Sequence, residues 1–209
     1  IGNDPVCERI RVIGRNVPTT EPTPDYSSLL EDESAFVTEG AVRPKLLGCR
    51  GDYVWGDGWT VTFLGDLATV DAYIEDFETL GVGRQTGTVT SHTGNGLLDG
   101  HRILGPTRRS GIDIEPLPGR LEQGFTFRNF SLVNTRLLPF TIGGGGSVRD
   151  IVIEDGEMGG NGMQVAKELG EFSDITVRRV ISSVGGGAVL KVVGVLRMTV
   201  TDMQARNGG

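Results

Sequence analysis

Short apolar segments recur along the chain at a nearly constant interval. In each, an apolar residue is followed by an outward position and a second inward position, the alternation typical of a β-strand with one buried face. The six segments are Ala72-Tyr73-Ile74, Leu97-Leu98-Asp99, Phe125-Thr126-Phe127, Ile151-Val152-Ile153, Ile175-Thr176-Val177 and Met198-Thr199-Val200. Their first residues are separated by 25, 28, 26, 24 and 23 positions. The second segment fits least well, because Asp99 falls where an apolar residue is expected.

A second short strand follows each of the first five segments. These strands begin at Gly87-Thr88, Gly111-Ile112, Pro139-Phe140, Gly162-Met163 and Gly187-Ala188, with steps of 24, 28, 23 and 25. Two strand markers that keep the same interval indicate a structural repeat, in which each coil buries apolar side chains against its neighbours. The predicted columns are Phe127, Ile153, Val177 and Val200 on one sheet, and Ile112, Phe140, Met163 and Ala188 on another.

This repeat predicts an all-β fold, a right-handed parallel β-helix. A period in the twenties, with short strands separated by Gly or Asn, is typical of that architecture. A leucine-rich repeat has an overlapping period but requires a regular Leu framework with an Asn position, which the sequence lacks. An antiparallel sandwich would not keep so constant an interval.

The repeat divides the chain into two regions. Residues 1–66 are expected to form the first coil or coils, with an excursion or cap over residues 18–48, where prolines stiffen the chain. Residues 67–209 are expected to form uninterrupted β-helix coils. Because solenoids cover their terminal coils and the sequence stops within one, we expect further protein or another chain beyond Gly209.

Composition narrows the classes of partner. Glycine accounts for 33 of 209 residues, about double the usual share of ~7%. The run from Gly143 to Gly146 is expected to be a flexible turn, because a strand rather than a phosphate-binding helix follows it.

The net charge of −7 opposes non-specific nucleic-acid binding. No apolar run is long enough for a transmembrane helix, so membrane insertion is not expected.

The cysteines and histidines are few. Cys7 and Cys49 allow either a disulfide or two buried thiols. His92 and His101 stand alone, and no Cys/His cluster occurs, so the sequence predicts no metal site and no cofactor. His92 lies in a turn-like stretch and is expected to face solvent.

The segment Gly111–Pro116 carries the most compact chemical constellation. On a strand, Ile112 and Ile114 point to one face, whereas Asp113 and Glu115 point to the other. If the isoleucines face the core, two carboxylates stand side by side on the outer surface. The alternative is that both are ordinary solvated residues of an exposed strand.

Three pieces on successive coils resemble a known family. They are Gly83-Arg84-Gln85-Thr86-Gly87, Gly111-Ile112-Asp113-Ile114-Glu115-Pro116 and Phe125-Thr126-Phe127-Arg128-Asn129-Phe130. With them, residues 71–140 resemble the right-handed parallel β-helix proteins grouped with pectate-lyase-like enzymes and phage tailspikes. The resemblance does not separate viral spikes from secreted polysaccharide enzymes.

The resemblance implies a site, because members of this group bind or cut polysaccharides along a lateral groove. Asp113 and Glu115 would be the catalytic pair, and Arg84 and Gln85 would bind substrate from the preceding coil. Alternate positions on a strand are roughly 7 Å apart, a separation that suits an inverting hydrolase. The like charge of Asp113 would raise the pKa of Glu115, as suits a general acid.

Two aromatic residues are further candidates for substrate binding. Trp55 and Trp59 flank a short turn, and their rings could stack on sugar rings. The alternative is that they pack in the core or in a cap.

These observations predict a phage tail fibre or tailspike module that is structural and binds, or cleaves, a bacterial surface or other polysaccharide. It would be a virion protein, a homotrimer associated with other tail proteins, and would bind no nucleic acid. The alternative is a secreted polysaccharide hydrolase, lyase or epimerase, and a third option is a scaffold alone. A lyase would need an arginine or lysine base above an acidic calcium site, and the third acid is not evident.

Overall fold

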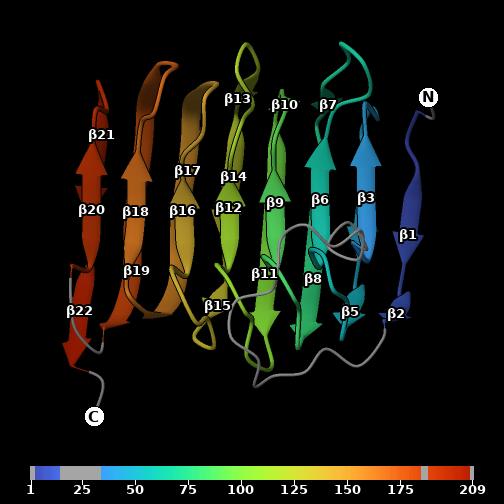
Figure 1. Cartoon of the computed structure of the whole chain (residues 1–209), viewed down its shortest axis with the longest axis horizontal. Helices are drawn as coiled ribbons and strands as arrows, with labels where there is room; N and C mark the ends of the chain where they lie inside the picture. Colours follow the sequence, from blue (N-terminus) through green and yellow to red (C-terminus); the bar gives the residue numbers. More distant parts are fainter. Residues whose placement is uncertain (1–2, 15–33, 185–187, 208–209) are drawn as a thin grey trace.

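The computed structural model describes residues 3–14, 34–184 and 188–207. Every regular element in this part of the chain is a β-strand, and no helix there could span a membrane. Figure 1 shows the strands side by side in two layers, with the coils following one another along the long axis from the N-terminal to the C-terminal end. The predicted fold class is confirmed: the protein is all-β, and its parallel strands stack as a solenoid.

The larger sheet forms one side of the coil and bends around it. It contains fifteen strands. They are β1 (Val6–Glu8), β2 (Arg11–Ile13), β4 (Lys45–Leu47), β5 (Arg50–Asp52), β7 (Thr69–Val70), β8 (Tyr73–Leu80), β10 (His92–Thr93), β11 (Gly96–Ile103), β13 (Leu121–Gln123), β14 (Phe125–Arg128), β15 (Ser131–Leu132), β17 (Ser147–Gly160), β19 (Phe172–Val184), β21 (Met198–Thr201) and β22 (Gln204–Asn207).

The seven-stranded sheet forms the opposite side, with one strand from each coil. Its strands are β3 (Phe36–Glu39), β6 (Trp59–Thr62), β9 (Gly87–Val89), β12 (Ile112–Ile114), β16 (Phe140–Ile142), β18 (Met163–Ala166) and β20 (Leu190–Val193).

The register between strands brings apolar residues of successive coils into columns. In the larger sheet, Phe127 lies opposite Ile153, which lies opposite Val177. All three side chains are fully buried. Val200 continues the column on β21, where it is exposed. The prediction of this column from the repeat is confirmed.

The predicted column of the seven-stranded sheet is correct for three of its four residues. Ile112, Phe140 and Met163 lie opposite one another as expected. The next member is Leu190. The prediction of Ala188 is wrong, because the chain reaches the strand β20 two residues later and Ala188 is exposed.

The predicted alignment of Leu97-Leu98-Asp99 is wrong by one residue. Gly96, rather than Leu97, lies opposite Phe125. A Cβ atom on Gly96 would come within 2.5 Å of the Phe125 ring, so neighbouring rings fill the space of the missing side chain. The shift places Leu98 in the core and Asp99 on the outer face.

This outward position explains why an acidic residue is tolerated in the segment. The guanidinium of Arg128, one coil further on, donates to Asp99 Oδ2 from Nε at 2.9 Å and from Nη2 at 2.6 Å. Its neighbour Asn129 donates to Asp99 Oδ1 at 2.6 Å. Asp99 therefore pairs with the next coil rather than interrupting the core.

Each coil turns through left-handed backbone at two corners of the larger sheet. Residues with positive φ at the first corner are Asp4, Arg43, Asp71, Gly94, Gly124, Asp150 and Asp174, and those at the second are Arg9, Gly48, Asp76, Gly100, Asn129, Asp155, Arg179 and Asp202. Gly, Asn and Asp adopt this conformation at the lowest cost among the amino acids. Their recurrence therefore bends the strands at fixed points without ending the hydrogen-bonded ladder.

Trp59 belongs to the core. It lies opposite Gly87 in the seven-stranded sheet, and its side chain is fully buried. A Cβ atom on Gly87 would lie 2.1 Å from the indole ring, so the ring fills the inward position of its own coil and the next. The indole also meets the His101 ring edge-on, with centroids 6.2 Å apart. Trp59 therefore offers no exposed face to a sugar.

Both histidines lie inside the coil, each fully buried. The expectation that His92 faces solvent is wrong, because β10 pairs with β7 and β13 and turns this side chain inward. The backbone N–H of Ala72 donates to His92 Nε2 at 3.3 Å. The proton of the neutral ring is therefore on Nδ1, which donates to the carbonyl oxygen of Gln123 at 3.0 Å.

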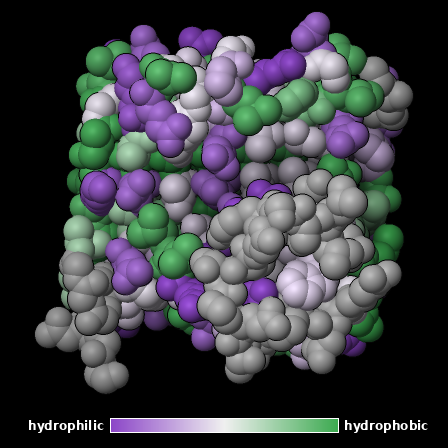
Figure 2. All heavy atoms as spheres, in the orientation of Figure 1, coloured by the Kyte–Doolittle hydropathy of each residue, from purple (hydrophilic) through white to green (hydrophobic). Residues whose placement is uncertain are grey.

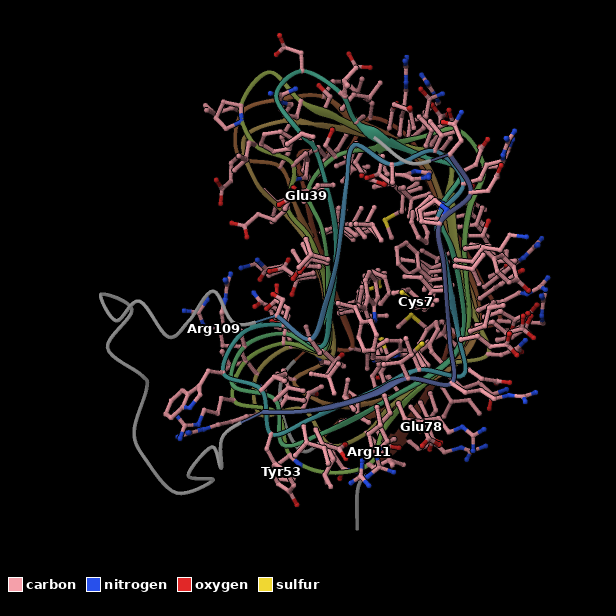
Figure 3. All side chains as sticks on the ribbon, turned by 90° about the vertical axis from the view of Figure 1, so that its right-hand side faces the viewer. Cys7, Arg11, Glu39, Tyr53, Glu78 and Arg109 are labelled. Atoms are coloured by element: carbon pink, nitrogen blue, oxygen red, sulfur yellow. The ribbon has the colours of Figure 1, made fainter. Side chains whose placement is uncertain are left out.

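The two cysteines are free thiols. Cys49 is buried, and Cys7 lies on the inner side of the first coil (Figure 3). The Cys49 thiol donates to the carbonyl oxygen of Cys7 at 3.3 Å. Of the two alternatives left by the sequence, the structure contains the thiols.

Part of the expected excursion over residues 18–48 belongs to the coil. Strands β3 and β4 lie within that range and pair with β6 and β8, respectively. The regular coil therefore resumes by Phe36, and the boundary expected at residue 48 is too late. Residues 18–33 lie outside the described residues.

Substituting Gly87 with alanine should destabilise the fold. The added methyl group meets the Trp59 ring in a packed core, and overpacking of this kind costs about 1–3 kcal/mol. Urea unfolding followed by circular dichroism measures the loss. Gly143→Ala is the matched control, since its Cβ would meet no atom closer than 3.9 Å. Equal stability of the Gly87→Ala variant and wild type would contradict this account of the core.

Candidate functional site

The strand β12 positions the predicted carboxylates. Ile112 and Ile114 are fully buried in the core, so Asp113 points to the outer side of the seven-stranded sheet. Glu115 follows the end of the strand and is exposed. Asp113 is 9% exposed, which corrects the expectation that both carboxylates stand free on the surface.

The structure brings Gln85 and Asp113 together. Gln85 precedes β9, the strand that pairs with β12, and its side-chain amide donates to Asp113 Oδ2 at 3.0 Å. The two residues are 28 positions apart, about one coil. Gln85 Oε1 has no hydrogen-bond partner in the part of the chain that the structure describes. Gln85 thus holds the Asp113 carboxyl from the preceding coil.

The pKa of Asp113 is raised to about 7. Burial is the main cause, and the neighbouring charge of Glu115 adds to it. The hydrogen bond from Gln85 and the charge of Arg84 act in the opposite direction. The sequence predicted Glu115 to be the general acid. The structure instead raises the pKa of Asp113, because Asp113 is the buried member of the pair.

Asp57 is a second buried carboxyl, and the sequence reasoning did not select it. It accepts a hydrogen bond from the backbone N–H of Gln85 at 3.2 Å, again 28 positions away. Burial raises the pKa of Asp57, and the charge of Arg84 opposes the shift. The repeat contained a signal, since Asp57, Gln85 and Asp113 follow one another at intervals of one coil.

Arg84 lies beside Asp57. Its Nε is 3.6 Å from Asp57 Oδ1, which makes an ion pair but is too long for a hydrogen bond. The positive charge of Arg84 also acts on Asp113, where it lowers the pKa of that carboxyl. Arg84 thus supplies positive charge between two coils.

Trp55 is half-buried in the segment before β6. The guanidinium carbon of Arg108 lies 5.1 Å from the centre of its ring, within cation–π range. Of the two predicted aromatic residues, Trp55 is therefore the one near the surface. Its ring face is shared with Arg108.

At one register position on the outer face of the seven-stranded sheet, the strands from β6 to β20 each carry a polar residue, whereas β3 carries Val37. We call this set the polar ladder: Thr60, Thr88, Asp113, Thr141, Gln164 and Lys191. Paired strands lie about 4.8 Å apart, so the ladder is a regular row along the axis. Thr60, Thr141 and Gln164 are partly exposed and Lys191 is exposed, whereas Thr88 and Asp113 are buried.

Charged groups border this face. Figure 3, which looks along the axis, shows Glu39 and Arg109 on the same side of the coil, towards opposite ends of the strands. Figure 2 shows hydrophilic residues interspersed with hydrophobic ones on the side that carries the seven-stranded sheet. The polar ladder therefore offers hydroxyl, amide, carboxyl and ammonium groups within a mixed surface.

The arrangement provides two chemical capabilities. The ladder supplies hydrogen-bond donors and acceptors at equal spacing along one direction. Asp113 supplies a carboxyl group that is partly protonated at neutral pH, as a general acid requires. Among the described residues, no group of three or more His, Cys, Asp or Glu side chains is placed to hold a metal ion.

Comparison with known proteins adds little to this geometry. No protein-family model matches the chain, and no curated protein matches it. Among solved structures, the chain is similar to QnrB1, a plasmid-mediated fluoroquinolone resistance protein, at 10% identity and a TM-score of 0.18. The match covers 98% of this chain and 91% of QnrB1. A TM-score this low carries no argument, and the class of the protein, a parallel β-solenoid, comes from its own strands.

The raised pKa of Asp113 should make stability depend on pH. A carboxyl with a raised folded-state pKa keeps its proton on folding, so the free energy of unfolding falls as pH rises from 3.8 to about 7. The slope from this group is about 1.4 kcal/mol per pH unit. Asp113→Asn cannot ionise, so its stability relative to wild type should increase over this window in urea unfolding.

Asp66→Asn is the control, because the Asp66 side chain is fully exposed. A constant difference between Asp113→Asn and wild type from pH 4 to pH 7 would show that Asp113 titrates normally.

Proposed function

We propose that this chain is a β-helix module of the phage tail fibre or tailspike type, which binds a polysaccharide along the outer face of its seven-stranded sheet. The observation that carries the proposal is the polar ladder, with one hydrogen-bonding side chain in each coil from β6 to β20. A polysaccharide is also a linear repeat, and its sugar units follow one another at an interval close to the spacing of the coils. A glycan lying along the axis would therefore meet a polar partner at each step.

Partly exposed members of the ladder are the direct contacts in this proposal. Thr141 and Gln164 are neighbours in register, and Lys191 extends the row towards the C-terminal coil. A hydroxyl, an amide and an ammonium group together offer donors and acceptors that match sugar hydroxyls. Glu115, exposed at the end of β12, adds an acceptor beside them.

The proposed setting is the tail of a virion, as a homotrimer together with other tail proteins. Its support is the resemblance of residues 71–140 to tailspike β-helices. The net charge of −7 disfavours nucleic acid as the partner. Secretion is the alternative setting. Light scattering measures the assembly directly against the 22.3 kDa of one chain.

A second candidate function is polysaccharide cleavage at the same face, in a hydrolase, lyase or epimerase. The observation that favours hydrolysis is the pKa of about 7 at Asp113. In this mechanism the Asp113 carboxyl donates its proton to the leaving glycosidic oxygen. The exposed Glu115 carboxylate takes a proton from the attacking water, which bonds to the anomeric carbon. The roles are the reverse of those expected from the sequence.

Glycan binding should depend on the ladder. Thr141→Val keeps the shape of the side chain but removes its hydroxyl, and the loss of one hydrogen bond of about 1 kcal/mol weakens binding about fivefold. A glycan array followed by calorimetry on the best ligand measures the effect. Thr126→Val is the matched control, since Thr126 is also partly exposed but lies in the larger sheet. Binding that is weakened by Thr126→Val and not by Thr141→Val would place the site elsewhere.

Cleavage should depend on Asp113. With a panel of bacterial and plant polysaccharides, Asp113→Asn should slow the release of reducing ends about 10²–10⁴-fold. The wild-type rate should fall as pH rises above about 7, because the acid must be protonated. Glu157→Gln, an exposed carboxylate of the larger sheet, is the control. Binding without product would leave the module as a binder, and full activity in both Asp113→Asn and Glu115→Gln would exclude this pair.

A further inference from the structure

A carboxyl group and an imidazole face each other inside the coil, in a part of the larger sheet that the proposed function does not use. Glu122 of β13 lies opposite His92 of β10. Both side chains are fully buried, and His92 Nδ1 is 3.6 Å from Glu122 Oε1, too far for a hydrogen bond. Neither carboxyl oxygen of Glu122 has a hydrogen-bond partner in the described part of the chain.

The strands around Glu122 provide no compensating charge. On one side it meets His92, and on the other Val148 of β17 lies opposite it. Among the described residues, the backbone N–H of His92 is the group that favours its ionised form, and no cation does. A carboxylate at this position would therefore be both dehydrated and unpaired, which is costly.

The surroundings of His92 are similarly apolar. Thr69 of β7 lies opposite it, and the Phe125 ring meets it edge-on with centroids 4.8 Å apart. The charged side chain that acts on it is Asp71, whose carboxylate favours the imidazolium. Burial outweighs this effect and lowers the pKa of His92 to about 4. The same cause raises the pKa of Glu122 well above its ordinary value.

We propose that the His92–Glu122 pair is a two-sided pH device. The wall formed by β7, β10 and β13 is fully closed only while both side chains are uncharged. Acid adds a proton to the imidazole of His92, and base removes one from the carboxyl of Glu122. Either charge is enclosed without an oppositely charged group in hydrogen-bond contact, and it loosens this wall of the coil.

The two residues act in opposite directions on the pH scale. Because the folded-state pKa of His92 is below 6.5, the unfolded chain binds a proton first, and stability falls as pH decreases from 6.5 to about 4. Because that of Glu122 is above 4.5, the folded chain keeps its proton longer, and stability falls as pH increases above 4.5. Between 4.5 and 6.5 the two contributions cancel, so single variants are needed to separate them.

Urea unfolding of the full chain across pH 3.5–9 tests the proposal with Glu122→Gln and His92→Gln. Relative to Glu122→Gln, the unfolding constant of wild type should rise about tenfold per pH unit above 4.5. Relative to His92→Gln, it should rise about tenfold per pH unit as pH falls from 6.5 to about 4, roughly 300-fold in all. Glu157→Gln controls for the loss of one carboxylate from the surface.

Nuclear magnetic resonance of the wild-type protein measures the titration of the histidine rings directly. The chain has two histidines, and neither ring signal should titrate between pH 8 and pH 5. A ring signal with a midpoint near 6.5, lost in His92→Gln, would overturn the proposal. So would pH-independent ratios of the unfolding constants, or an imidazolium at His92 near neutral pH, which would make the pair an internal salt bridge instead.

Discussion

Contact between like positions of neighbouring coils is the interaction on which the structure depends. A single coil cannot cover its own apolar residues, so Phe127 is buried only because Leu98 and Ile153 lie above and below it. The contacts are complementary in shape as well as apolar. Where a large ring occupies two levels, as Trp59 does, the neighbouring coil has glycine at that position. Stability is therefore shared between coils rather than held within any one of them.

The same register also orders the outside of the molecule. Strands that align their inward residues necessarily align their outward residues, and this produces the row from Thr60 to Lys191. It also brings Gln85 to the Asp113 carboxyl, although the two are a full coil apart in sequence. The candidate site is thus a consequence of stacking, since no single coil contains it.

The sequence predicted the architecture because the apolar repeat is strong, and it failed where the inward residue has no side chain. Gly96 occupies an inward position, so the run of apolar residues in that coil begins only at Leu97, and an alignment on Leu97 misplaces Asp99. The repeat also starts β20 too early, at Ala188. In each case the interval was nearly right, and the error was one or two residues.

The candidate site was less predictable because burial depends on contacts between distant segments. The alternation of apolar and polar residues correctly predicted that the Asp113 side chain points outward. Its burial and raised pKa follow from neighbouring segments that the strand pattern does not specify. Asp57 lies in a turn, so the apolar alternation of the strands does not mark it, and only its spacing of one coil from Gln85 does. His92 and Glu122 contradict the usual exclusion of ionisable groups from a core, and the turn-like sequence around His92 suggested the surface.

The left-handed corners have a consequence for how this molecule can vary. The segments from Asp71 to Asp76, Gly124 to Asn129 and Asp150 to Asp155 each span five positions, so the bent part of the larger sheet has an almost constant length. Differences in coil length fall instead in the connections before and after the seven-stranded sheet. Insertions there can therefore remodel the borders of the outer face of the seven-stranded sheet while the stacked interior stays unchanged.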